Sequence, residues 1–469
     1  MAALPGCSRR FSGGDSPRTP NKLLATSARS VWSPASSCTA SFRATSSSRS
    51  TDRSLRTAGW TSDRGRSCRS HFSRLPERPV VPSVAALSRH PDTATAIGEV
   101  VGTVLEQIGN EPDLAVLFLT PSHLPAVEHA GATVQTLLAP AAFIGAGASG
   151  VLAAAEAVES RPGVALWAAR WPSRHERAAE IHPLHLTANR PTGKDGPWQF
   201  DGLEEAPIGA GRGLLLLTDP FTFPADEFLE LLATTAPGMP IVGGLASAAH
   251  APTGNRLVVG GRVVRNGAVG VIVPLDLLAP AVVSQGCRPI GKPMTVTKSI
   301  NNVLYELAGR PALDAVLDLV AGLEPTERAL ADLGLHCGIV VDDSKLDFGR
   351  GDFLIRGVLG ASKEHRAVVI GDQAPIGTTV QFQVRDAATA GEDLEELLGQ
   401  AEANLNGALV FTCNGRGAAM FGSADHDAAI VSEAVPQGVA GMFCAGEIGP
   451  IGQRNALHGF TASLALFRE

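Results

Sequence analysis

Two glycine-rich turns near the C-terminus carry side chains that could bind a small molecule. The first follows an apolar run of strand length and holds Cys413, Asn414 and Arg416, and the second holds Glu447. Glycines let backbone N–H groups approach a ligand closely, so polar side chains on such turns can converge on one site. His458 lies on a third glycine turn. These five residues are the first candidates for ligand binding.

Cys413 allows two interpretations. The guanidinium of Arg416 and nearby backbone N–H groups could stabilise its thiolate, which would make it reactive or ligand-contacting. Alternatively, Cys413 is the last inward residue of a buried strand and acts as a small apolar side chain.

Arg416 and Glu447 also allow two interpretations, since each is a charged residue on a glycine turn after an apolar strand. They could hold complementary groups of a ligand, in which case truncation of Arg416 would hardly change the stability of the empty protein. Alternatively, they pair with each other and brace the two turns. A second function class, an enzyme of small-molecule metabolism, would use Cys413, Arg416, Glu447 or His458.

Two more cations are candidates for the same cleft. Arg288 lies on the turn Gly286-Cys287-Arg288-Pro289, and Lys298 follows a few residues later. The pair His182 and His185 is not a zinc site in this interpretation, because residues three apart in a strand point to opposite faces.

A third function class is suggested by Gly145, Gly147 and Gly150, which satisfy the pattern G-x-G-x-x-G. With a helix over 151–158 and Arg170 beyond it, they would bind the pyrophosphate and 2′-phosphate of NADP. These glycines lie deep inside the domain, however, rather than after its first strand. NADP binding therefore stays an alternative, and the main interpretation includes no cofactor.

The first 76 residues differ in composition from the rest of the chain. They contain thirteen Lys or Arg and three acids, a charge of +10, and are rich in Ser. The whole chain carries −7, so the remainder carries −17. The segment 1–76 is typical of an organelle transit peptide, with chloroplast favoured over mitochondrion. The alternative is a disordered basic arm. The acidic remainder argues against nucleic acid as a partner, and no apolar run is long enough to predict a membrane partner.

The elements that must position these residues alternate between strands and helices. The spacing predicts a helix over 93–108, with Thr93 and Thr95 as possible caps. A strand–helix–strand unit that ends in glycines recurs three times, which suggests an internal repeat. Gly260-Gly261 and Asn266-Gly267 predict hairpins, and hence antiparallel pairing. We therefore expect an α+β or mixed α/β fold in two domains, 88–278 and 279–469, with antiparallel or mixed sheets and flanking helices.

Several longer blocks resemble the FIST family, whose name refers to F-box and intracellular signal transduction. They are Val283–Gly291, Tyr305–Leu313 and Phe382–Asp386, together with the C-terminal glycine turns. The resemblance covers roughly residues 90–469. It implies FIST N-like and FIST C-like domains in a sensory protein that binds a small polar ligand, with a protein partner for signal output. Some proteins similar to this family are thought to bind haem, but the chain has no C-x-x-C-H motif. No F-box or other output segment is recognised in it.

Overall fold

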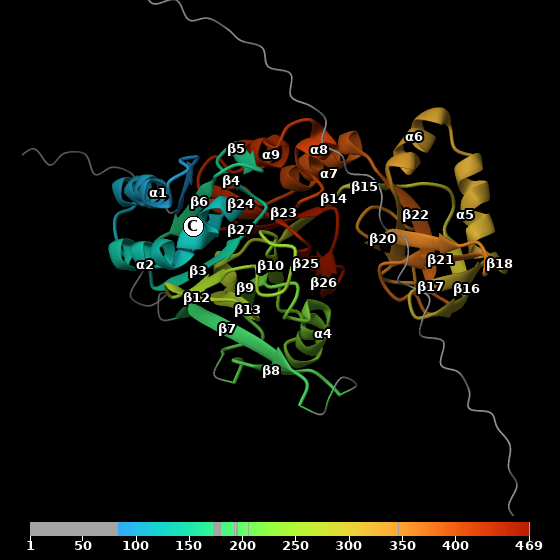
Figure 1. Ribbon diagram of the computed structural model, residues 1–469, viewed down its shortest axis with the longest axis horizontal. Coiled ribbons are helices and arrows are strands. Elements are labelled where there is room, and N and C mark those ends of the chain that lie inside the picture. Colours follow the sequence, from blue (N-terminus) through green and yellow to red (C-terminus); the bar gives the residue numbers. More distant parts are fainter. Residues whose placement is uncertain are drawn as a thin grey trace, which may run out of the picture. The chain divides into compact units, whose positions relative to one another are not determined.

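The part of the chain that the computed structural model describes contains runs of strands separated by helices. This part comprises residues 83–171, 180–191, 193, 196–204, 206–345 and 347–468. It belongs to one compact unit, Arg74–Glu469. Three sheets form a central body and a fourth forms a barrel, with helices on their faces (Figure 1). The expected mixed α+β fold is confirmed.

The repeated strand–helix–strand unit is present three times. In each copy the two strands are parallel neighbours, because the helix between them returns the chain to the same end of the sheet. The first unit is β2 (Leu114–Leu119), α2 (Val127–Leu138) and β3 (Ala142–Gly147); the second is β9 (Arg212–Thr218), α4 (Ala225–Thr235) and β10 (Ile241–Leu245); the third is β23 (Gly407–Cys413), α9 (His426–Ala434) and β24 (Val439–Cys444).

Each unit is extended by antiparallel strands next to its first strand. These outer strands are β6 (Val164–Ala169) and β1 (Ser83–Ser88) in the first sheet, β13 (Ala268–Pro274), β7 (His182–Asn189) and β8 (Gln199–Asp201) in the second, and β27 (Thr461–Phe467) and β14 (Val282–Gln285) in the third. The three sheets therefore share one plan, as expected for an internal repeat.

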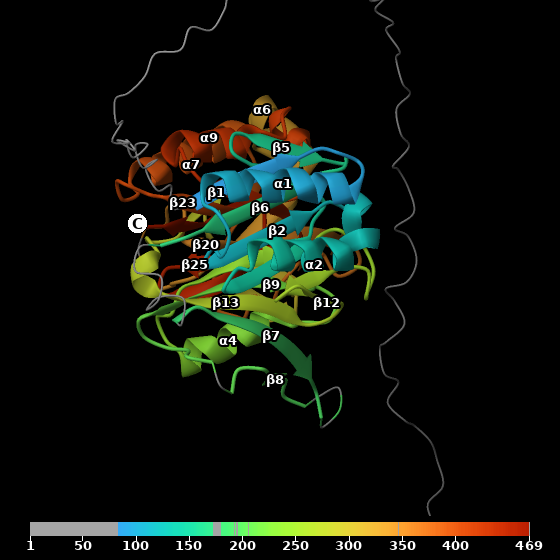
Figure 2. The same ribbon diagram turned by 90° about the vertical axis from the view of Figure 1, so that its left-hand side faces the viewer.

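A hairpin follows the second strand of every unit and pairs with a different unit. The hairpin β4–β5 (Gly150–Ala153, Glu156–Glu159) follows the first unit but joins β24 of the third; β11–β12 (Leu257–Val259, Arg262–Val264) follows the second but joins β3 of the first; β25–β26 (Glu447–Ile451, Arg454–His458) follows the third but joins β10 of the second. In both ribbon views β5 lies beside α9, far from it in sequence (Figures 1 and 2). The hairpins are thus exchanged in a ring, and strands from both sides of the expected boundary near 274–280 share two sheets.

The inner faces of the three sheets meet in one apolar core, to which Phe118, Leu217, Phe411 and Phe467 contribute. The outer faces are covered by helices. The helix α1 (Thr93–Gln107) packs with α2 on the first sheet, α4 covers the second, and α7 (Ala387–Gly399) packs with α9 on the third. Figure 2 shows α1 and α2 side by side over β2 and β6. Each sheet therefore lies between the shared apolar core and its own helices.

The fourth sheet closes on itself, because β19 pairs with β20 on one side and with β22 on the other. Its strands are β15 (Cys287–Pro289), β16 (Met294–Ile300), β17 (Val303–Leu307), β18 (Arg310–Pro311), β19 (Leu335–Val340), β20 (Phe353–Ser362), β21 (Ala367–Ile370) and β22 (Thr379–Arg385). The helices α5 (Ala312–Ala321) and α6 (Pro325–Leu333) flank this barrel (Figure 1).

Three local predictions were wrong. The N-cap of α1 is Asp92, whose carboxylate accepts a hydrogen bond from the Thr95 backbone at 2.9 Å, so Thr93 and Thr95 are not the cap. Gly260-Gly261 does form a hairpin, but Asn266-Gly267 connects two different sheets. The helix over 151–158 that the NADP alternative required is absent, because this range forms the hairpin β4–β5.

The hairpin at 151–158 removes the element that NADP binding requires. Gly145 and Gly147 lie within strand β3, and Gly150 starts β4. No helix N-terminus follows the glycines to face a pyrophosphate.

No helix among the described residues is long and apolar enough to cross a membrane. The expected transit peptide, 1–76, lies outside the described residues.

Candidate functional site

Arg416 is buried and paired with an acid that the sequence did not suggest. It follows β23, and its guanidinium donates from Nε and Nη2 to the two carboxylate oxygens of Asp427 at 2.8 and 2.9 Å. Asp427 lies in the first turn of α9 and also accepts from Thr412 at 2.5 Å and contacts His426. Burial opposes the charge on Asp427, but Arg416 and the other donors hold its pKa well below the usual range. The alternative in which Arg416 and Glu447 pair with each other is therefore wrong.

Glu447 starts β25 and is fully buried. One carboxylate oxygen, Oε2, accepts hydrogen bonds from the backbone N–H and the hydroxyl of Thr461 at 3.2 and 2.9 Å. The other oxygen, Oε1, has no hydrogen-bond partner among the described residues. Burial raises the pKa of Glu447 to about 8, and Thr461, Cys413 and Arg416 oppose this only in part. The carboxyl group is thus largely protonated at neutral pH.

Cys413 is a thiol, not the stabilised thiolate that was one interpretation. Burial and then the neighbouring Glu447 raise its pKa well above the ordinary value. Gly415 has no side chain, and this leaves a small space beside the thiol. A Cβ added at Gly415 would make ordinary contacts there, at 3.4 Å from the Phe460 ring and 3.7 Å from the Cys413 sulfur. Gly415 is partly exposed and Asn414 is exposed. A methyl-sized space beside the thiol therefore lies close to the protein surface.

These groups form one set, which we call the buried polar cluster: Thr412, Cys413, Arg416, Asp427, Glu447 and Thr461. Arg416 interacts electrostatically with both Cys413 and Glu447. Like Glu447 Oε1, the Nη1 nitrogen of Arg416 has no hydrogen-bond partner among the described residues. Buried polar groups are almost always hydrogen-bonded, so two such atoms in one cluster call for an explanation.

The prediction from the sequence did not include Asp427, Thr412 and Thr461 as members of the cluster. Asp427 looked like the start of a helix, and the two threonines like ordinary strand residues. A buried Arg needs a carboxylate, and an acid in the first turn of the next helix was the available signal.

His458 lies next to Glu447, as its register partner in the hairpin β25–β26. Its Nε2 lies 3.0 Å from the carbonyl oxygen of Gly449, and burial lowers its pKa to about 4. A neutral imidazole therefore donates to that carbonyl. His458 thus supports the turn that carries Glu447, and its ring is not hydrogen-bonded to Cys413.

Arg288 and Lys298 do not join the cluster. Arg288 pairs with Glu327 and Asp386 at 2.8 and 2.9 Å, and Lys298 lies 4.0 Å from Glu306 on the barrel. Gly286, two residues before Arg288, does lie beside the buried polar cluster. A Cβ added at Gly286 would lie 3.0 Å from Arg416 Nη1. The side chain of Arg288 points elsewhere because these two acids neutralise it.

Phe460 lies between the cluster and the barrel. Its backbone has a φ of 62°, in the left-handed region that costs energy for a bulky residue. The ring packs edge-on against His336 of β19, with centroids 4.2 Å apart, and Arg385 of β22 lies over it at 5.6 Å. His336 is buried, which lowers its pKa to about 4. The ring therefore forms the wall between the space at Gly415 and the barrel.

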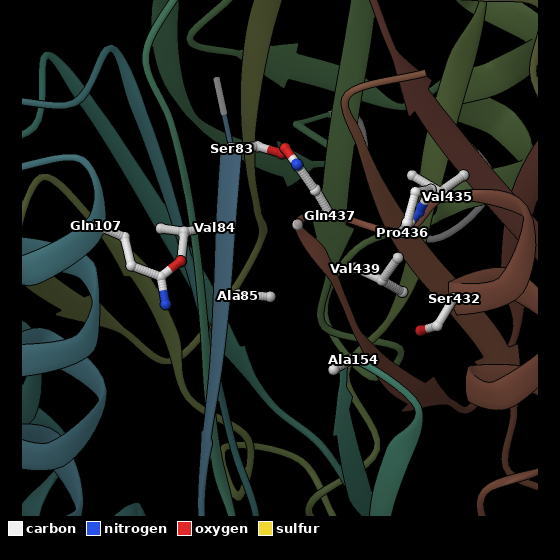
Figure 3. A pocket seen from close by; sticks show the side chains of 11 residues that line it. Ser83, Val84, Ala85, Gln107, Ala154, Ser432, Val435, Pro436, Gln437 and Val439 are labelled. Atoms are coloured by element: carbon white, nitrogen blue, oxygen red, sulfur yellow. The ribbon is translucent and has the colours of Figure 1, made fainter. Parts of the chain in front are cut away.

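Two hollows lie elsewhere on the described chain. One, of about 270 Å³, lies between β1 and the segment 435–439, with Ser83 and Gln437 on opposite walls (Figure 3). The other, of about 410 Å³, lies beside His182, His185 and Glu204. Neither contains a residue of the buried polar cluster. The first has no charged side chain among its described lining residues.

Comparison with known proteins agrees with the resemblance seen in the sequence. The FIST N domain model matches residues 113–310, and the FIST C domain model matches residues 312–450. An uncharacterized protein of Mycobacterium tuberculosis is 42% identical over 389 residues, which cover 81% of this chain and 98% of that protein. One of Mycobacterium bovis is 41% identical over 386 residues, covering 80% and 96%.

Proposed function

The chain belongs to the FIST family, and from this premise we propose that it is a sensory protein whose buried polar cluster binds a small polar ligand. FIST domains are associated with signalling. In this proposal Arg416 and Glu447 hold the ligand, and Cys413 lines the site. Phe460 and the barrel residues behind it transmit occupancy to a protein partner.

One observation carries the proposal. Arg416 Nη1 and Glu447 Oε1 are both withdrawn from solvent, and neither has a hydrogen-bond partner among the described residues. Leaving such a group unpaired costs about 1–3 kcal/mol, and more for a charged group. A ligand that bonded both atoms would recover this energy. Gly415, which is partly exposed, leaves room for a methyl group beside Cys413, at the edge of the cluster nearest to solvent.

The enzyme interpretation receives less support. A Cys–His nucleophile needs a thiolate beside an imidazole that can accept its proton. Here burial raises the pKa of Cys413, and His458 faces the Gly449 carbonyl.

The proposal can be tested by thermal unfolding of the full chain against a panel of amino acids, organic acids, amides and nucleobases. A ligand that binds only the folded state raises the melting temperature by mass action. We expect at least one panel compound to stabilise the wild type but not Glu447→Leu, which has a similar size but cannot hydrogen-bond the ligand.

Asp219→Asn is a matched control. Asp219 is also a buried carboxyl after the first strand of a unit, but it is bonded to Asn255 and Thr222 in the second sheet. Stabilisation should persist in this variant. A panel that stabilises nothing, or a compound that stabilises Glu447→Leu as strongly as the wild type, would count against the site.

A further inference from the structure

We propose that the group bound in the buried polar cluster is an uncharged carbonyl, such as that of an amide, and not a carboxylate or phosphate. This inference rests on the proposed function and names the ligand chemistry of the same site. It follows from the charges that the fold has already paired.

The positive charge of Arg416 is already neutralised. Asp427 takes the Nε and Nη2 donors in a bidentate pair, and both side chains are at least 95% buried. A guanidinium that recognises an anion normally offers this two-donor edge to it. Three N–H groups of the guanidinium remain, two of them on Nη1, which has no hydrogen-bond partner among the described residues, and they can donate to a carbonyl oxygen while the net charge of the pair stays zero.

The remaining charges near the cluster do not favour an anion either. Glu447 is neutral or negative, never positive. Arg385 lies over the Phe460 ring, and the carboxylate of Glu159 accepts from the Ala418 backbone at 2.8 Å. The positive charges of Arg416 and Arg385 are therefore balanced by Asp427 and Glu159. The net charge of these groups together with Glu447 is zero when Glu447 is protonated and −1 when it is ionised. An anion would be desolvated without gaining a compensating cation.

Glu447 completes the expected contact. Its Oε2 accepts from Thr461, and the Cys413 thiol also interacts with this carboxyl, so a protonated Glu447 can donate from Oε1. Arg416 Nη1 and Glu447 Oε1 are thus two donors for a carbonyl oxygen or its neighbouring groups. An amide suits this site because its oxygen can accept hydrogen bonds from Arg416 Nη1 and Glu447 Oε1. Its N–H group can at the same time donate to an acceptor atom of the cluster.

Cys413 provides a test that needs no known ligand. Iodoacetamide and iodoacetate are of nearly equal size, but one is an uncharged amide and the other a carboxylate. In both reactions the Cys413 sulfur bonds to the methylene carbon, iodide leaves with the bonding electrons, and the thiol proton passes to solvent. The full chain is treated with each reagent at about pH 7, below the pKa of Glu447, for long enough that the small ionised fraction of the thiol reacts. Mass spectrometry then follows the peptide that contains Cys413.

The rate of Cys413 alkylation by each reagent is divided by the rate of the same reagent with glutathione. This ratio corrects for the different intrinsic reactivities of the two reagents. We expect Cys413 to favour iodoacetamide by a relative factor on the order of ten, the scale of one unscreened charge at a partly buried site. Asp427→Asn, which leaves the Arg416 charge unpaired, should shift the preference toward iodoacetate. Asp219→Asn, which alters a distant buried carboxyl, should leave it unchanged.

Equal relative rates, or a preference for iodoacetate in the wild type, would overturn the uncharged-ligand inference. Either result is compatible with a panel compound that binds through Glu447, so the proposed function could survive it. Conversely, a tenfold preference together with a panel that stabilises nothing would leave the charge selectivity intact and refute ligand sensing. If wild-type Cys413 resists both reagents, the same ratio is measured in Phe460→Ala, which removes the ring beside Gly415.

Discussion

Arg416 and Asp427 form a bidentate ion pair in which both charged groups are shielded from water. The pair joins the turn after β23 to the first turn of α9, so it fixes the third strand–helix–strand unit at the end where the cluster lies. Arg416 is therefore a structural residue as well as a candidate ligand contact.

Arg416→Ala should destabilise the empty protein by about 3–5 kcal/mol, because it leaves the Asp427 charge buried without its partner. Urea unfolding of Arg416→Ala, Asp427→Ala and the double variant measures this. The double variant should lose much less than the sum of the two single losses. Additive losses, or a loss below about 1 kcal/mol for Arg416→Ala, would contradict a structural role for the pair.

Glu447→Gln should change how stability depends on pH. The pKa of Glu447 is raised from 4.5 to about 8 in the folded protein. Between these values the folded protein holds a proton that the unfolded chain has released, so rising pH reduces the stability of the wild type. Gln cannot titrate. The stability of Glu447→Gln relative to the wild type should therefore increase by about 2–4 kcal/mol between pH 5 and pH 8.

Urea unfolding of both proteins at several pH values checks this prediction. The buried His336 and His458, whose pKa values are lowered to about 4, titrate in both proteins and cancel in the difference. Acidification below the ordinary histidine pKa should destabilise both proteins, because the unfolded chains take up protons first. A difference between the two proteins that does not change with pH would mean that Glu447 is ionised in the folded state.

Gly415→Ala should block the space beside Cys413 without damaging the fold. The added methyl makes ordinary contacts with Phe460 and the thiol, and the stability change should be within about 1 kcal/mol. Alkylation of Cys413 by iodoacetamide should slow by roughly tenfold, the effect of about 1.4 kcal/mol on a barrier. Gly286→Ala is the contrast, since its methyl would lie 2.5 Å from the Phe460 carbonyl oxygen and should destabilise the protein. Unchanged alkylation in Gly415→Ala would show that reagents reach Cys413 by another route.

We also propose that residues 1–76 direct the protein to chloroplasts. The support is compositional: thirteen basic and three acidic residues, with abundant serine. A fluorescent protein fused to this segment should enter plastids in plant cells, and the chain without it should not. Accumulation of the fusion in mitochondria would favour the alternative organelle, and accumulation in the nucleus would indicate a basic arm that binds nucleic acid.

The parts of the fold that depend on nearby residues were predictable. Apolar runs gave strands such as β2 and β23, and helical spacing gave α1. The repeat was visible because each strand–helix–strand unit is continuous in sequence. The pairing of β4 with β24 was not, because no local pattern specifies a partner almost 300 residues away.

The candidate site was predicted in position but not in its pairings. Cys413, Arg416 and Glu447 do come together, since glycine turns after buried strands meet at sheet ends. The partner of Arg416 was missed because α9 starts at His426 and brings Asp427 under the turn, a tertiary contact. The state of Cys413 was open because burial, which the sequence does not give, outweighs the nearby guanidinium.

The exchanged hairpins connect the three sheets of the body through backbone hydrogen bonds. Each sheet needs two strands that the chain supplies from another unit, so no unit can detach with its own hydrogen bonds complete. Opening one sheet exposes edges in the next, and the body should unfold in a single cooperative transition instead of unit by unit. The same linkage gives a change at Glu447, the first residue of an exchanged hairpin, a direct path into the second sheet through its neighbour Gly244.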